Sequence, residues 1–168
     1  MDTLWAPWRM EYIRRVVGKM EACIFCPMLE LGDDRERLIL ARGRQSFVVL
    51  NRYPYNTGHL LIVPHQHGER LGDVPPSAWA EVMELAGASV EILRETVQAA
   101  GANIGLNLGR VAGAGIADHC HLHVVPRWVG DFNFLPVLAA TKSMPEYLLE
   151  TYDKLRPAFV KLEKREGK

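Results

Sequence analysis

Residues 118–128 read Asp118-His119-Cys120-His121-Leu122-His123-Val124-Val125-Pro126-Arg127-Trp128. Histidines alternate here with Cys120 and Leu122, and successive side chains of an extended strand point to opposite faces. We therefore expect a strand over residues 119–125 that presents three imidazoles on one face. A strand rises about 3.3 Å per residue, so neighbouring imidazoles are about 6.6 Å apart and the outer two about 13 Å. One ion with metal–nitrogen bonds of about 2.0–2.1 Å reaches an adjacent pair but not all three, so the three histidines must have different roles.

Short apolar runs and turn residues surround this strand. Apolar residues recur at helical spacing over 77–100, which predicts one long helix. The capping-box pattern Ser143-Met144-Pro145-Glu146 predicts a C-terminal helix, interrupted near Pro157. Four further strands are expected at residues 38–41, 47–50, 60–63 and 103–108. Because strands do not alternate with helices, we expect an α+β fold with a mostly antiparallel five-stranded sheet.

The composition suits one compact domain. The 168 residues are 48% hydrophobic and 24% charged, and 20 Lys and Arg balance 20 Asp and Glu. A net charge of zero gives no sign of nucleic acid or an anionic membrane as partner. Asp2, Arg9 and Glu11 interrupt the N-terminus, and no apolar run approaches the roughly 20 residues that span a bilayer. We therefore expect a single domain over residues 1–168 in the cytoplasm.

Two of the three cysteines are paired as Cys23-Ile24-Phe25-Cys26. In a reducing compartment this spacing indicates metal ligands or a redox pair, and the redox pair lacks the βαβ context that it requires. Both cysteines, one of His65 or His67, and one histidine of the row would form a closed Cys₂His₂ zinc site. Binding of a metal by the row alone stays an alternative. Cys120, on the other face of the strand, is expected to be buried packing.

His121, the centre of the row, is the candidate nucleophile. A neutral imidazole with a pKa near about 6.5 is mostly unprotonated at pH 7 and can attack phosphorus. Its other nitrogen needs an acceptor that fixes the tautomer, most simply a backbone carbonyl. His59 and His123 can donate protons to phosphate oxygens, and the glycine-rich loop from Gly113 to Gly115 can add backbone dipoles. This chemistry needs no organic cofactor.

Two separated motifs carry a resemblance to a known family. Residues 119–125 match the signature of the histidine triad (HIT) superfamily, His-φ-His-φ-His-φ-φ with φ apolar. Pro126-Arg127, and upstream Asn51-Arg52-x-Pro54-x-x-x-Gly58-His59, resemble the fragile histidine triad branch. The resemblance covers about residues 20–128. It implies a HIT-like α+β fold, a homodimer that joins two sheets, and nucleotidyl transfer through a covalent nucleotidyl-histidine.

The resemblance also implies roles for individual residues. His121 matches the nucleophile, His123 a phosphate ligand, and His59 a residue that steadies both nucleophile and phosphate. Asn51 stands where the family grips the ribose hydroxyls, and Asn107 where it contacts the phosphate end of the site. The remaining nucleotide-binding positions that we expect are the loop residues Gly113, Ala114 and Gly115.

Bacterial members with a C-x-x-C hold a structural zinc ion. The matching ligands in this chain are Cys23, Cys26, His67 and His119. The terminal segments outside the core, with Trp5-Ala6-Pro7-Trp8-Arg9 near the start, are expected to lie on the domain or on a dimer partner. This motif and Arg127-Trp128 are similar to the bacterial subgroup that includes diadenosine polyphosphate phosphorylases.

The expected function is cleavage of a dinucleoside polyphosphate, such as diadenosine tetraphosphate, with water or inorganic phosphate as final acceptor. Many family members carry Gln followed by Ser or Thr just before the triad, and the hydroxyl assists the leaving group. This chain has Gly115 and Ile116 instead. A polyphosphate leaves as a stabilised anion and needs less protonation than an amine does. A purine nucleoside phosphoramidase and a non-catalytic nucleotide-binding module remain the alternatives.

Overall fold

The computed structural model describes residues 23–30, 32–131 and 146–166. The expected packing of the first 20 residues, and the capping-box residue Ser143, lie outside these described residues. In chain order the elements are η2 (Cys26–Leu29), α2 (Asp34–Arg37), β1 (Ile39–Arg42), β2 (Ser46–Leu50), β3 (Leu60–Pro64), η3 (Leu71–Asp73), α3 (Pro76–Val97), β4 (Gly101–Leu106), η4 (Arg110–Ala112), β5 (Leu122–Arg127) and α5 (Leu148–Glu166).

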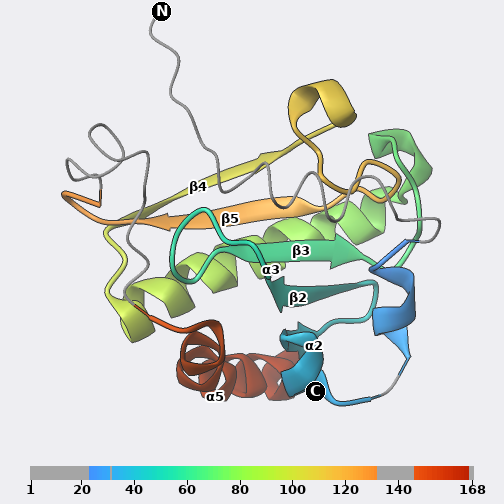
Figure 1. Ribbon diagram of the computed structural model, residues 1–168. Coiled ribbons are helices and arrows are strands. Elements are labelled where there is room, and N and C mark those ends of the chain that lie inside the picture. The colour runs from blue at the N-terminus through green and yellow to red at the C-terminus, as the bar shows by residue number, and fades with distance from the viewer. Residues whose placement is uncertain (1–22, 31, 132–145, 167–168) are drawn as a thin grey trace, which may run out of the picture.

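The five strands form one sheet in the order β1-β2-β3-β5-β4, and every neighbouring pair is antiparallel. Helix α3 connects β3 to β4 and lies behind the sheet (Figure 1). Every residue of the central strands β2 and β3 is buried. The predicted α+β fold with an antiparallel five-stranded sheet and one long helix is therefore confirmed.

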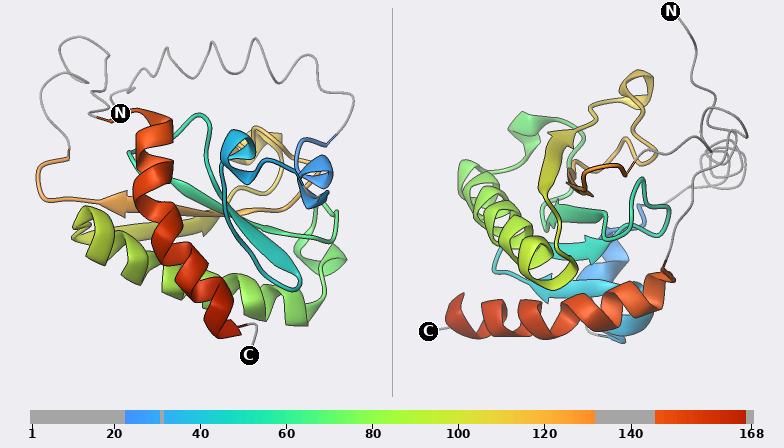
Figure 2. Two further views of the ribbon diagram at one scale, coloured as in Figure 1. Left: turned by 90° about the horizontal axis from the view of Figure 1, so that it is seen from below. Right: turned by 90° about the vertical axis from the view of Figure 1, so that its left-hand side faces the viewer.

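The strand register decides which face of the sheet carries the histidines. His123 on β5 pairs with Leu61 on β3 and with Gly105 on β4, so these three share a face. Pro126 lies three residues further along β5 and so points to the opposite face. Pro126 and Leu93 of α3 are both neighbours of Gly58, so Pro126 points to the face of the sheet that α3 covers. The His123 side chain and helix α3 therefore lie on opposite faces of the sheet, and Figures 1 and 2 show α3 against one of these faces.

The triad strand starts and ends later than predicted, since β5 spans Leu122–Arg127 instead of residues 119–125. Strand β5 begins at Leu122, so of the three histidines of the row only His123 lies in the sheet. The backbone N–H of Cys120 donates to the carbonyl of Gly68, in the loop that follows β3, at 2.7 Å. The ladder between β3 and β5 ends at the pair Ile62 and Leu122. The backbone before Leu122 therefore forms its hydrogen bond with a loop residue, Gly68, and not with a neighbouring strand. The alternating pattern could not predict this.

Helix α5 packs against β1, the edge strand of the sheet (Figure 2). The Tyr152 hydroxyl donates to the carbonyl of Ile39 at 3.0 Å, and the Arg156 guanidinium donates to the carbonyl of Leu40 at 2.6 Å. These bonds satisfy backbone groups that an edge strand otherwise exposes. The expected interruption at Pro157 was wrong, since α5 is continuous through it. Its neighbours are fixed on the body of the protein, which offsets the missing helical hydrogen bond.

Among the helices in the described ranges, none has the length and apolar character that crossing a bilayer requires.

Candidate active site and metal centre

A chain of hydrogen bonds sets the proton positions of His59 and His123. The backbone N–H of Tyr55 donates to His59 Nδ1 at 3.0 Å, and the Asn51 amide lies 3.3 Å from the same atom. His59 Nδ1 is therefore an acceptor, and the ring proton is on Nε2. His59 Nε2 lies 2.9 Å from His123 Nδ1 and donates to it. His123 then carries its own proton on Nε2, and the Asn107 side-chain amide 3.5 Å away accepts this proton only when its oxygen, not its nitrogen, faces the ring.

His121 has the opposite arrangement. Its Nδ1 lies 2.9 Å from the carbonyl oxygen of His119, which can only accept, so Nδ1 carries the proton and Nε2 the lone pair. The side chain is 5% exposed, and burial lowers the pKa of His121 below its ordinary value of 6.5. Within the described residues Nε2 makes no hydrogen bond. The ring centre lies 4.9 Å from that of His123. A ring nitrogen with a free lone pair on His121 therefore lies beside a proton donor on His123.

Among the predicted nucleotide-binding residues, Asn51 contacts His59 and Asn107 lies beside His123. Asn51 Oδ1 accepts from the backbone N–H of Tyr53 at 2.9 Å, so both ends of its amide contact the protein. The backbone N–H groups of Gly113 and Ala114 bond within their own loop, to the carbonyls of Arg110 and Gly109. No such backbone bond is found for Gly115 among the described residues.

Cys23, Cys26, His67 and His119 come together although the chain separates them widely. The Sγ of Cys23 lies 3.3 Å from His119 Nδ1, and the Sγ of Cys26 lies 3.3 Å from His67 Nδ1. All four ligand atoms lie within 4.8 Å of one another. A tetrahedral zinc ion, with bonds of about 2.3 Å to sulfur and about 2.0–2.1 Å to nitrogen, separates its ligand atoms by roughly 3.3–3.8 Å. The distances from Cys23 to His119, from Cys26 to His67 and from Cys26 to His119 are 3.3, 3.3 and 3.8 Å, so the donor set fits such an ion.

Of the two histidines in the loop after β3, His67 and not His65 belongs to the group that could hold a metal ion. The His65 ring stacks on Phe47 with ring centres 6.2 Å apart, and burial lowers its pKa. The row does not converge on one point, because His119 Nδ1 faces the cysteines whereas His121 Nδ1 faces a carbonyl. The Cys₂His₂ group, and not the row alone, is therefore the candidate metal site.

His119 connects the Cys₂His₂ group to His121. Its Nε2 donates to the carbonyl of Pro64 at 2.9 Å, which leaves the Nδ1 lone pair for a metal. Its own carbonyl fixes the tautomer of His121. Burial and the neighbouring Cys23 thiol raise the pKa of Cys26, and a bound cation reverses this effect because it binds the thiolate. The side chain and the backbone of one residue therefore serve two different sites.

Two aromatic residues at the site were not predicted. The ring centre of Tyr55 lies 4.7 Å from that of His59 and 5.8 Å from that of His123. Phe25 lies 5.4 Å from His119 and 5.2 Å from His121. The sequence signal for Phe25 is its position between the two cysteines. Tyr55 lies in a turn-rich segment, which by itself predicted only a loop.

Comparisons with known proteins agree with this geometry. Residues 35–129, more than half of the chain, match the model of the HIT domain. An AP-4-A phosphorylase from Mycobacterium tuberculosis is 37% identical over 158 residues, which cover 90% of this chain and 80% of that protein. An adenosine 5'-monophosphoramidase from Candida albicans is 28% identical over 110 residues, which cover 63% of this chain and 70% of that protein.

A solved structure extends the likeness to three dimensions. A Zn-bound histidine triad family protein from Mycobacterium smegmatis superimposes with a TM-score of 0.68 at 27% identity, covering 86% of this chain and 98% of that one. The match with the family model spans strands β1 to β5, including His59 and the histidine row. This chain belongs to the HIT domain family.

Proposed function

We propose that this protein is an enzyme that cleaves dinucleoside polyphosphates through a covalent nucleotidyl-histidine on His121. The observation that carries the proposal is the fixed tautomer of His121, whose Nδ1–H is held by the carbonyl of His119. Its Nε2 lone pair stands beside His123, whose Nε2 carries a proton. A nucleophile and a donor with complementary protonation are what attack on a phosphate requires.

The proposed reaction has two steps. In the first, the Nε2 lone pair of His121 attacks the α-phosphorus, a P–N bond forms, and the bond from phosphorus to the bridging oxygen breaks. The polyphosphate nucleotide leaves as an anion, while His123 donates a hydrogen bond to a non-bridging oxygen. In the second step, an oxygen of water or inorganic phosphate attacks the same phosphorus. The P–N bond breaks, its electron pair returns to Nε2, and the second nucleotide is released.

The segment before the triad favours a polyphosphate over a phosphoramidate. Ile116 is 8% exposed and belongs to the hydrophobic core, so this position offers no hydroxyl for a leaving amine. A polyphosphate needs less protonation to leave. The similarity to an AP-4-A phosphorylase supports this preference. The similarity to an adenosine 5'-monophosphoramidase keeps phosphoramidate cleavage as the second candidate.

Asn51 and Asn107 flank the catalytic histidines from two sides. Asn51 contacts His59, and Asn107 contacts His123. In the proposed complex Asn51 contacts the ribose and Asn107 the phosphate. The loop of Gly113, Ala114 and Gly115, which adjoins the triad in sequence, supplies the remaining nucleotide contacts.

A structural zinc ion is proposed for the Cys₂His₂ group. When bound, it supplies a cross-link between three segments that are distant in sequence, namely the N-terminal cysteine pair, the loop after β3 and the start of the triad. The fit of donor atoms and the tautomer of His119 support zinc. Thiolate ligands persist in a reducing compartment, which supports a cytoplasmic location.

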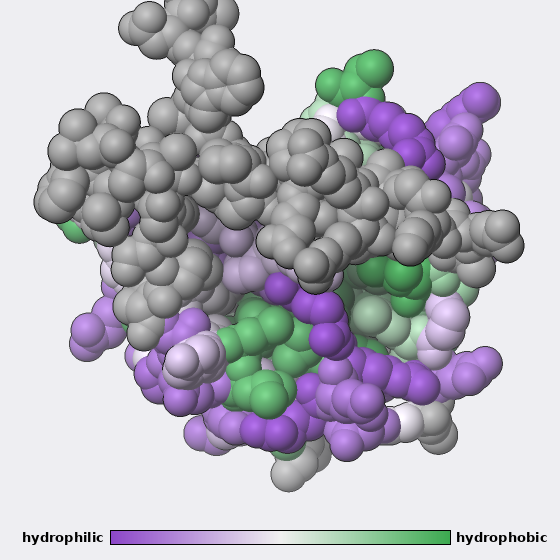
Figure 3. Space-filling model, viewed as in Figure 1, coloured by the Kyte–Doolittle hydropathy of each residue, from purple (hydrophilic) through white to green (hydrophobic). Residues whose placement is uncertain are grey.

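A homodimer is proposed through the free edge of β4. This strand pairs only with β5 among the described strands, and most of its residues are exposed. Ile104 is 46% exposed and Leu108 is 42% exposed, and Val111 of η4 is fully exposed. Figure 3 shows hydrophobic surface standing out over η4. An exposed apolar edge strand favours pairing with a second copy.

The test combines covalent labelling with product analysis. We expect substrate labelled at the α-phosphate to give an acid-labile label on the wild type and none on His121→Asn. His65→Asn, a change of another half-buried imidazole outside the catalytic pair, keeps the label. With diadenosine tetraphosphate, ADP formed only when phosphate is added identifies a phosphorylase, and AMP identifies a hydrolase. A wild type that binds nucleotide without label or turnover would instead be a non-catalytic module.

A further inference from the structure

Phe25 connects the cysteine segment of the candidate metal group to His121, the proposed nucleophile. It lies between Cys23 and Cys26, and its side chain is 1% exposed. Its ring meets His119 edge-on, at an interplanar angle of 79°, and meets His121 at 55°. The segment that supplies two thiols to the metal group therefore also supplies an aromatic wall to the proposed nucleophile.

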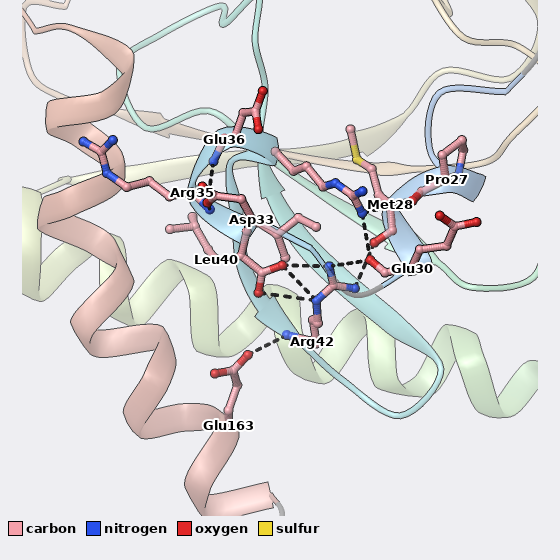
Figure 4. Close-up of polar contacts among 12 residues, drawn as sticks. Pro27, Met28, Glu30, Asp33, Arg35, Glu36, Leu40, Arg42 and Glu163 are labelled. Atoms are coloured by element: carbon pink, nitrogen blue, oxygen red, sulfur yellow. Dashed lines mark hydrogen bonds and ion pairs between the residues drawn. The ribbon is translucent and has the colours of Figure 1, made fainter.

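The position of this ring is set from outside the catalytic site. The carbonyl of Phe25 accepts from the backbone N–H of Met28 at 2.9 Å, at the start of η2. Arg42 of β1 donates to the carbonyl of Met28 at 2.9 Å (Figure 4). Arg42 also forms an ion pair with Asp34 at 2.7 Å. Arg37 donates to the carbonyls at either side, those of Pro27 and Glu30. Two arginines thus hold the backbone that carries Phe25.

The contacts of His121 leave one degree of freedom open. The bond from Nδ1 to the carbonyl of His119 fixes the tautomer, but a single bond of this kind tolerates a range of ring tilts because the second side-chain torsion of histidine is broad. In-line attack on phosphorus requires the Nε2 lone pair to point at the reacting atom. Within the described part of the chain, Phe25 and His123 are the rings that bound this tilt.

We propose that Phe25 is a positioning residue, through which the cysteine segment holds the His121 ring in its attacking orientation. This inference rests on the proposed function, because it assumes that His121 attacks phosphorus. It extends that function by making the Cys23 to Cys26 segment part of the support of the nucleophile, as well as part of the metal group. In this proposal Phe25 acts on the reaction through the His121 ring that it contacts, and not by binding the substrate.

The experiment compares two buried phenylalanines. Phe25→Leu removes the ring beside His121, and Phe159→Leu removes a similarly buried ring on α5, for which no ring contact with a described histidine is found. We expect both variants to melt at lower temperature than the wild type, because each loses buried ring contacts. Phe25→Leu alone should label His121 at least about tenfold more slowly in a single turnover, since a small misplacement of reacting atoms is costly. Its nucleotide Kd should stay within about twofold of the wild-type value.

Several outcomes would overturn the inference. Equal labelling rates for the two variants would show that Phe25 only fills the core. Loss of zinc from Phe25→Leu would show that the slower labelling comes from damage to the metal group. Zinc content and competition with a chelator are therefore measured on each variant. Phe25→Met, which restores bulk without a ring, replaces Phe25→Leu if the latter does not fold. Absence of label on the wild type would refute the proposed function itself, whereas labelled wild type with an equally fast Phe25→Leu would refute only the role of Phe25.

Discussion

The Nδ1 atom of His121 lies 2.9 Å from the carbonyl oxygen of His119, while Nδ1 of His119 itself lies 3.3 Å from the Sγ of Cys23. Two residues apart in the chain, these imidazoles face different partners and hold opposite tautomers. His119 Nδ1 faces the cysteines of the group that could hold a metal, whereas the lone pair of His121 is on Nε2. The alternation of the triad therefore separates the proposed structural role from the proposed chemical one within one short segment.

His59 is predicted to act through the protonation of His123. In His59→Ala, the Nδ1 of His123 loses its donor, and the proton of His123 is no longer held on Nε2. We expect kcat to fall by about 10²-fold, the usual cost of one lost donor to a developing oxyanion. His59→Gln, whose amide N–H can replace the donor, should retain more activity. Steady-state kinetics on both variants check this, and equal loss in the two would contradict the hydrogen-bond chain.

His67 is predicted to be required for metal binding, whereas His65 is not. In His67→Ala one of four ligand atoms is lost, so zinc content should fall below about one per chain and the melting temperature should drop. The variant His65→Ala, two residues earlier, should keep its zinc, because the His65 ring of the wild type stacks on Phe47 and does not face the cysteines. Elemental analysis and thermal melts measure both effects. Full zinc occupancy in His67→Ala would remove it from the ligand set.

Tyr152 is predicted to make stability depend on alkaline pH. Burial raises the pKa of Tyr152 above its ordinary value of 10.0, so above pH 10.0 the unfolded chain loses the proton first. The free energy of unfolding then falls as the pH rises. At pH 7, Tyr152→Phe should cost about 1–3 kcal/mol, since the carbonyl of Ile39 is left without its donor. Urea unfolding from pH 7 to 10.5 should show this difference narrowing, and a constant difference would contradict the assignment.

Ile104 is predicted to lie in a dimer interface along β4. Ile104→Glu places a charge on the exposed edge strand, so we expect the proposed dimer to dissociate. Met83→Glu, at a 57% exposed position of α3, is the control and should leave the assembly unchanged. Sedimentation equilibrium distinguishes the two masses. A monomeric wild type would refute the dimer, and a dimeric Ile104→Glu would exclude this edge.

The local patterns of the chain predicted much of the site. The place of His123 in an apolar strand and that of His59 before a buried run are relations between near neighbours, which strand geometry translates directly into space, whereas His119 and His121 precede β5. The C-x-x-C pair predicted a metal group for the same reason. The five strands and the long helix followed from apolar periodicity, with errors confined to their ends.

Only the tertiary structure decided how distant segments meet. His67 rather than His65 approaches Cys26 across 41 positions, and His119 approaches Cys23 across 96. The tautomers of His59, His121 and His123, and the contact of Phe25 with the nucleophile, also depend on these approaches. Spacing along a chain specifies what neighbours can share, but which ring nitrogen carries a proton is set by whichever donor or acceptor the folded sheet brings beside it.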